Sequence, residues 1–278
     1  MARRSELQRS IEDHDRYIDS AVAALVARVK RITDRATIRA TNRLRRELET
    51  AKGQVRPVAA NQRALRSFAA IFDEELTKLG YYTVIDAFTR ETFPGQAPFF
   101  TEAFDVINRS LKQPLPDPRL RPEDLRFITS QQISAGVVLG GEAARIGETA
   151  MAQALLSVGG TGIDALIEAL ADRLQMLPAK VESLSVTALT IHYRTLQDLS
   201  YRRVEEDSGE ELLFRYFGPR DRRNRPFCRR VLGDNKPRSK KEVLALDNAP
   251  SSLTNAFLHG GGYRCRHRWA AVGFKETT

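Results

Sequence analysis

The residue types best suited to ligand chemistry gather near the C-terminus, where both cysteines and two of the four histidines lie between positions 228 and 267. Cys265 and His267 are separated by one residue, so in an extended strand their side chains would share one face. Cys228 can join them from a short helix, and His259 is the nearest further candidate. Four nitrogen or sulfur ligands form a tetrahedral zinc site, and a module of about 60 residues gains stability from such an ion.

Three other roles are open for the same side chains. The two cysteines can be small core residues, or they can form a disulfide on oxidation. A Cys–His nucleophile pair is the third role, but nothing in the sequence marks an oxyanion hole or a further group that would orient the pair. We therefore expect no catalytic residue here.

Arginines surround the same positions. Arginine is suited to bidentate phosphate contacts, and because aromatic residues nearby are few, we expect sequence-independent DNA or partner contact with a steep salt dependence. The first group is Arg220, Arg222, Arg223, Arg225, Arg229 and Arg230. The second group is Arg264, Arg266 and Arg268, which a final strand would present as a ridge opposite Cys265, His267 and Trp269.

The charge of the chain is divided by region. Residues 1–56 contain 14 Lys/Arg and 8 Asp/Glu, residues 57–214 contain 15 and 22, and residues 215–275 contain 15 and 4. Both ends are therefore basic and the middle is acidic. A basic end can bind phosphate backbones or an acidic protein surface, or it can be a solvated face without a partner.

The composition excludes several classes of protein. In 278 residues that are 42% hydrophobic, no apolar run approaches the roughly 20 residues that a bilayer span needs, so we expect no membrane association. The charged N-terminus shows no secretory signal. Two cysteines cannot form a disulfide framework, which fits a reducing compartment.

The elements that must position these residues are mainly α-helical. Apolar residues spaced by three and four predict one long N-terminal helix over about 5–50, and further helices over about 61–79, 128–157, 161–177 and 179–205. Six prolines make residues 93–127 a connector. We expect an N-terminal helical region with this connector (1–127), a helical body (128–206) and a small basic α+β module (207–278).

Local signals within the module are consistent with one another. Alternation over residues 212–217 predicts a strand, and Pro226 suits the first turn of a short helix for which Asn224 is a candidate cap. Ser239 and Glu242 match a capping box. A glycine turn at 260–262 leads to the expected final strand.

The run YFGPRDRRNRPFC and the later GGGYRCRHRW resemble the C-terminal part of phage head morphogenesis proteins, the minor head proteins similar to the Mu F family. The resemblance covers about residues 160–272. Asn224 stands where threonine is usual in the family, and Arg264 stands where asparagine is expected. The matching residues are Asp221, Arg225, Pro226, Phe227, Cys228, Gly261, Gly262, Tyr263, Cys265, Arg266, His267 and Trp269.

The resemblance implies a structural, non-enzymatic role in a virion. Such a protein would be oligomeric in the particle and would lie in the head interior or at the portal vertex, after assembly in the host cytoplasm. Its partners would be the portal or other head and connector proteins, together with packaged DNA bound without sequence preference.

Two other classes are alternatives to this role. A metal-assisted nuclease or toxin-like domain is one, although Asp221 and Asp247 are the only promising acids near the cluster and metal-assisted cleavage commonly uses paired carboxylates. A free DNA-binding regulator is the other, and no helix-turn-helix pattern supports it.

Overall fold

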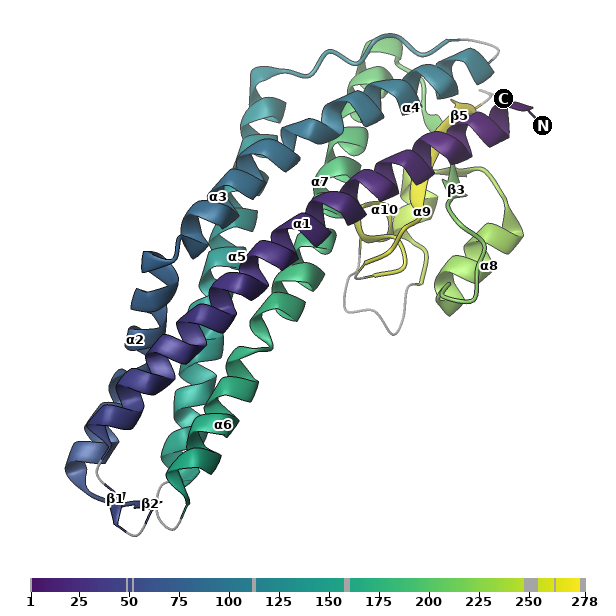
Figure 1. The fold of residues 1–278 in the computed structure, drawn as a ribbon. Helices are drawn as coiled ribbons and strands as arrows, with labels where there is room; N and C mark the ends of the chain where they lie inside the picture. Colours follow the sequence, from purple (N-terminus) through teal and green to yellow (C-terminus); the bar gives the residue numbers. More distant parts are fainter. Residues whose placement is uncertain are drawn as a thin grey trace. The chain divides into compact units, whose positions relative to one another are not determined.

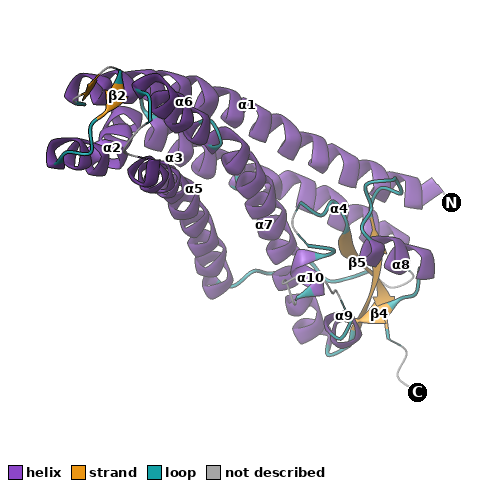
Figure 2. Cartoon of the chain, turned by 90° about the horizontal axis from the view of Figure 1, so that it is seen from below, coloured by secondary structure: helices purple, strands orange, loops and turns teal. Residues whose placement is uncertain are grey.

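The computed structural model describes residues 2–48, 50–51, 53–111, 114–157, 161–247, 255–262 and 264–275. The chain is mostly helical and carries a small three-stranded antiparallel sheet near the C-terminus (Figures 1 and 2). This confirms the predicted fold class. No helix in the described parts of the chain has both the length and the apolar character that a bilayer span requires.

The element bounds are as follows. The helices are α1 (Ala2–Glu47), α2 (Ala59–Lys78), α3 (Tyr81–Thr92), η1 (Pro94–Gln96), α4 (Ala97–Ser110), α5 (Pro122–Ser157), α6 (Ile163–Leu174), α7 (Leu177–Ser208), α8 (Pro226–Asp234), α9 (Lys240–Leu244) and α10 (Ala256–His259). The strands are β1 (Thr50–Ala51), β2 (Gln54–Val55), β3 (Leu212–Phe217), β4 (Arg238–Ser239) and β5 (Arg268–Phe274).

The chain forms two compact units, and each combines separate stretches of sequence. Unit 1 consists of Met1–Ser20, Glu91–Gln132 and Val186–Thr278, whereas unit 2 consists of Ala21–Arg90 and Ile133–Ser185. The predicted regions were consecutive along the chain. Of their boundaries, the one near residue 207 coincides with the end of α7 at Ser208.

Unit 2 is a helical bundle built on the stripe predicted for the long N-terminal helix. Val22, Leu25 and Val29 of α1 are buried, as the spacing of three and four requires. The small residues of α5 allow close packing: a methyl group at Gly147 would lie 3.5 Å from Phe72 and 3.6 Å from the backbone of Ala69. The hairpin of β1 and β2 also belongs to this unit.

Unit 1 holds the C-terminal module against the first part of α1, α4 and α7. The module's sheet has the order β4-β3-β5, and all its pairs are antiparallel. One apolar cluster joins the module to the helices of the unit, so the module has no separate core. Its members include Leu7 and Ile11 of α1, Phe104 and Ile107 of α4, Tyr201 of α7, and Phe214 and Trp269 of the sheet.

Several local expectations for the module are confirmed and others are wrong. Ser239 and Glu242 form the reciprocal capping box, and Pro226 begins α8. Asn224 does not cap α8, because the cap position is Arg225 and the Asn224 amide donates to the Pro219 carbonyl instead. The final strand begins only at Arg268. The predicted connector, residues 93–127, contains η1, α4 and the start of α5.

Candidate metal centre

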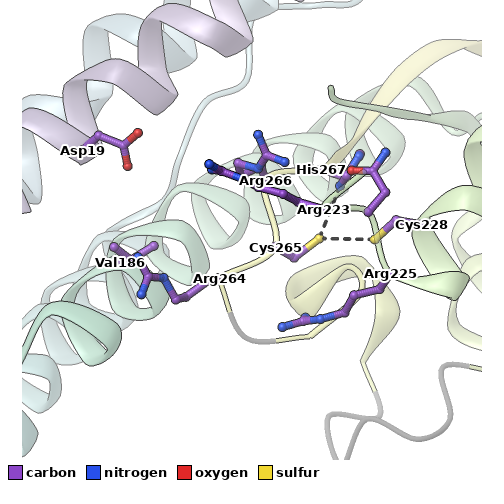
Figure 3. Close-up of a pocket in the computed structure, with 10 residues that line it drawn as sticks. Asp19, Val186, Arg223, Arg225, Cys228, Arg264, Cys265, Arg266 and His267 are labelled. Atoms are coloured by element: carbon purple, nitrogen blue, oxygen red, sulfur yellow. Dashed lines mark hydrogen bonds between the residues drawn. The ribbon is translucent and has the colours of Figure 1, made fainter. Parts of the chain in front are cut away.

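Three of the four predicted ligands meet in one buried group. Cys228 comes from α8, whereas Cys265 and His267 come from the loop before β5, and their ligand atoms all lie within 4.8 Å of one another. The two Sγ atoms are 3.8 Å apart, and Cys265 Sγ is 3.6 Å from Nδ1 of His267 (Figure 3). All three side chains are buried. The group could therefore hold a metal ion.

The His267 ring is oriented for ligation. Its Nε2 lies 2.8 Å from the Pro219 carbonyl oxygen and must donate its proton there. In the neutral ring Nδ1 is then the unprotonated nitrogen, and it lies 3.6 Å from Cys265 Sγ. A backbone carbonyl that fixes the second ring nitrogen is the usual support of a metal-bound histidine.

Hydrogen-bond donors also surround the sulfur atoms. The Gly261 N–H donates to Cys265 Sγ at 3.2 Å, and the Tyr216 hydroxyl lies 3.4 Å from Cys265 Sγ and 3.7 Å from Cys228 Sγ. The pKa of Cys265 is lowered, chiefly because its sulfur accepts a hydrogen bond from Cys228. The pKa of Cys228 is raised by the same bond and by burial. The pair therefore favours a single negative charge on Cys265, ready for a cation.

The glycine turn is explained by close approach to the sulfur atoms. A methyl group at Gly261 would collide with Cys228 Sγ. Gly260 has a φ of +54°, and a methyl group there would lie 2.9 Å from the Tyr216 hydroxyl and 3.0 Å from Cys265 Sγ. Only glycine fits these two positions while Cys228 and Cys265 keep their places in the group.

Arg194 of α7 holds the ligand loop in place, and sequence reasoning missed it. This buried side chain donates to three backbone carbonyls, those of Leu258 at 2.8 Å, Cys265 at 2.6 Å and His267 at 2.5 Å. Its charge also helps to lower the pKa of Cys265. The available signal was an arginine beside Tyr193, on the apolar side of the helix that precedes the module.

The fourth predicted ligand does not join the group. His259 lies on α10 and is half-buried, and its ligand atoms are outside the set formed by the other three residues. Its pKa is lowered, mainly by burial.

The predicted ridge of arginines is also wrong, because residues 264–267 precede the strand. Arg264 has a φ of +53°, and the Cys265 N–H bonds to the Gly262 carbonyl in a turn. Arg266 pairs with Asp221 at 2.7 Å, whereas Arg268 is buried and pairs with Asp15 at 2.7 Å. The three side chains therefore serve different contacts.

The six arginines of 220–230 are exposed, as a DNA or partner surface requires. Four of them also donate hydrogen bonds to backbone carbonyls. These bonds shape the turn and α8, so the cluster has a structural use besides any binding. Each of the four donates to a carbonyl: Arg220 to Leu232 at 2.6 Å, Arg225 to Gly261 at 2.7 Å, Arg229 to Asn224 at 2.8 Å and Arg230 to Asp247 at 2.5 Å.

The remaining motif residues support the module. Asp221 accepts from Arg266 and from the N–H of Arg223, Phe227 packs edge-on against Tyr216, and buried Trp269 donates to the Ala256 carbonyl at 3.0 Å. Gly262 donates to the His259 carbonyl in the turn. Tyr263 lies outside the described residues.

Cys228, Cys265 and His267, called the metal group below, lie in the wall of a pocket of about 350 Å³ (Figure 3). The other lining residues are Asp19, Val186, Arg223, Asn224, Arg225, Arg264 and Arg266. All of them belong to unit 1.

Comparisons of the chain with protein-family models, with curated proteins and with solved structures gave no match.

Proposed function

We propose that this chain is a structural minor head protein of a tailed bacteriophage, and that a zinc ion holds its C-terminal module together. The observation that carries the proposal is the meeting of Cys228, Cys265 and His267 in one buried group. These residues are central to the resemblance to the Mu F-like family, and Cys228 and Cys265 are 37 positions apart in the sequence. The geometry thereby supports a chemical purpose for the motif residues of this chain.

The distances favour zinc over a disulfide. Zinc bonds of about 2.3 Å to sulfur and about 2.0–2.1 Å to nitrogen place tetrahedral ligands about 3.8 Å (S–S) and about 3.6 Å (S–N) apart. The separations in the cluster are 3.8 Å and 3.6 Å. A disulfide needs sulfur atoms about 2.05 Å apart, and both cysteines are free.

A structural role fits the module better than catalysis does. Asp221 is engaged by Arg266 and by a backbone N–H, and it is not part of the metal group. The module shares its core with α1, α4 and α7, so an ion that orders the module also orders the helical part of unit 1. We propose that the helices dock on the portal or another head protein, and that the exposed arginines contact packaged DNA or a neighbouring subunit.

Metal analysis of the full chain, purified without chelators, tests the chemical part of the proposal. We expect about one zinc per chain, and we expect Cys228→Ser and Cys265→Ser to lose it. His259→Asn is the matched control, because His259 lies outside the group and the variant should keep its metal. Absence of stoichiometric metal from the wild-type protein would show that the zinc proposal is wrong.

Crosslinking of virions or infected cells, read by mass spectrometry, tests the biological part. We expect the protein in the head interior or portal vertex of particles, as an oligomer, and in the host cytoplasm during assembly. Crosslinks from residues 1–50 or 160–205 to a portal protein would support the assignment. A protein that is absent from particles and found only with host nucleic acid would contradict it.

A further inference from the structure

Among the residues that the structure describes, the candidate metal group offers three protein ligands. Among the described residues, only Cys228, Cys265 and His267 bring ligand atoms together, and His259 lies apart from them. Structural zinc sites are usually closed by four protein ligands, whereas a three-ligand site keeps one position for an outside molecule. A metal held by these three residues would therefore keep a fourth position for an exogenous ligand.

The surroundings of the group indicate what that ligand is. The pocket that includes the three ligand residues is lined by four arginines, two from the turn before α8 and two from the loop before β5 (Figure 3). Among the described residues that line the pocket, Asp19 of α1 is the one carboxylate, and Asp221 pairs with Arg266 from outside this lining. The four lining arginines therefore outnumber the nearby carboxylates. Arg225 and Arg266 are braced by the Gly261 carbonyl and by Asp221, which fixes their positions at the rim.

We infer that this pocket binds a phosphate group, one oxygen of which is the fourth ligand of the metal. A guanidinium group can donate two hydrogen bonds to two oxygens of one phosphate, and the charge of four arginines exceeds that of Asp19 and Asp221 together. The inference rests on the metal site proposed above. Free phosphate and the phosphodiester of a DNA backbone share this chemistry. In both, the phosphate group is small enough to enter a pocket of about 350 Å³.

The test uses the full chain loaded with Co²⁺ in place of zinc, because the visible d–d bands of Co²⁺ report the ligands of the metal directly. Inorganic phosphate, a short DNA duplex and acetate are titrated separately. We expect phosphate or DNA to shift the bands in a saturable manner, and acetate to act only at much higher concentration. The concentrations of DNA phosphate and of free phosphate that shift the bands are compared. If DNA acts at the lower concentration, the DNA backbone is the source of the phosphate ligand, and if free phosphate does, the free anion is the ligand.

Two neighbouring arginines provide the matched variants. Arg223 lines the pocket, and Arg222 is exposed on the same turn but is not among the lining residues. Arg223→Gln should weaken the response to inorganic phosphate about tenfold or more, the value expected for one lost charge-assisted hydrogen bond. Arg222→Gln removes an arginine proposed for DNA contact outside the pocket, so it should leave the response to inorganic phosphate unchanged within about twofold.

The possible results separate this inference from the metal proposal. Bound Co²⁺ with bands that ignore phosphate and DNA would overturn the phosphate inference and leave the metal site standing. Equal sensitivity to acetate and phosphate, or equal effects of the two variants on the response to inorganic phosphate, would also overturn it. Failure to bind either Co²⁺ or zinc would show that both the metal proposal and the phosphate inference are wrong.

Discussion

At the scale of single residues, the metal group depends on the lack of a side chain at Gly261. A methyl group there would collide with Cys228 Sγ, although all three ligands would remain. Gly261→Ala should therefore reduce zinc content to a small fraction of the wild-type value. Gly233→Ala is the control, because Gly233 lies within α8 with open space around it, and alanine there should be neutral or stabilise by about 0.5–1 kcal/mol.

Metal analysis and thermal melting, with and without a chelator, measure both variants. The chelator should lower the melting temperature of wild type and of Gly233→Ala, and it should have little effect on Gly261→Ala. A Gly261→Ala protein with full zinc content would show that the turn is not built around the cluster as described.

Arg194 carries a second residue-scale prediction. Removal of its guanidinium leaves three carbonyls without their donor, two in buried bonds and one in a part-buried bond, and each bond to a charged donor contributes about 1.5–3 kcal/mol. Arg194→Met should thus lower the free energy of unfolding by at least about 3 kcal/mol, as measured in urea. Arg202→Gln on the same helix, where the arginine is exposed and pairs with Asp198, should cost less than about 1 kcal/mol.

The candidate ligands could be predicted from the sequence, but Arg194, which holds the ligand loop, could not. Cys228, Cys265 and His267 could be singled out because their types are rare in this chain and their spacing is specific. Arg194 could not, because its partners are backbone carbonyls 64 to 73 positions away, and a carbonyl leaves no trace in the sequence. His259 was a wrong addition, since proximity along the chain does not bring its ring to the group.

At the scale of elements, a buried chain of hydrogen bonds joins α1, η1, α7 and β5. His192 Nδ1 lies 3.1 Å from the Gln96 amide nitrogen, the Gln96 oxygen lies 3.0 Å from His14 Nε2, and His14 Nδ1 lies 2.9 Å from Arg268. Both Nδ1 atoms must accept, so both imidazoles are neutral. Burial lowers the pKa of His192 to about 4, and burial followed by the charge of Arg268 lowers that of His14.

These buried hydrogen bonds of His14 and His192 predict a loss of folding stability in mild acid. In the unfolded state each imidazole takes up a proton near pH 6.5, whereas the folded protein resists protonation until about pH 4 at His192. Stability is therefore fully present above pH 6.5 and falls as the pH falls from about 6.5 toward about 4. Between pH 7.5 and 5 His192 alone should account for about 2 kcal/mol.

Urea unfolding at pH 7.5 and at pH 5 measures the effect. The comparison of interest is with His192→Asn, whose amide oxygen can still accept from Gln96 but does not titrate. The variant should be less dependent on pH by about the same 2 kcal/mol, whereas Asp15 and Arg268 contribute equally to both proteins. The same pH dependence in both would mean that His192 is not held neutral.

The elements themselves were largely predictable, and the exceptions have physical causes. The spacing of Val22, Leu25 and Val29 predicted α1, and Ser239 with Glu242 predicted the start of α9. Alternation from Arg264 onward predicts a strand, but the chain turns there, and Cys265 and His267 both lie near Cys228. Period-two patterning cannot distinguish a strand from a turn of this kind.

At the scale of the whole molecule, the basic segment 215–275 follows a region with more acidic than basic residues. Counterion release should then control any DNA binding, with a slope of log K against log salt of about −0.9 for each phosphate contacted. We expect binding of a random duplex to weaken steeply between about 50 and 200 mM salt. Binding that ignores salt would contradict an electrostatic contact.

A pair of double variants localises this contact. Arg222→Gln with Arg229→Gln removes two charges from the exposed arginines of the module, and Arg63→Gln with Arg66→Gln removes two exposed charges from α2 in unit 2. The net charge changes equally in both. The first pair should flatten the salt slope by up to about 1.8, which corresponds to two lost phosphate contacts, and the second should leave the slope unchanged. Fluorescence anisotropy with a labelled duplex at several salt concentrations measures the slopes, and thermal melting confirms that each variant is folded. Equal flattening by both pairs would mean that DNA responds to the net charge of the chain, so that the module would have no special part in binding.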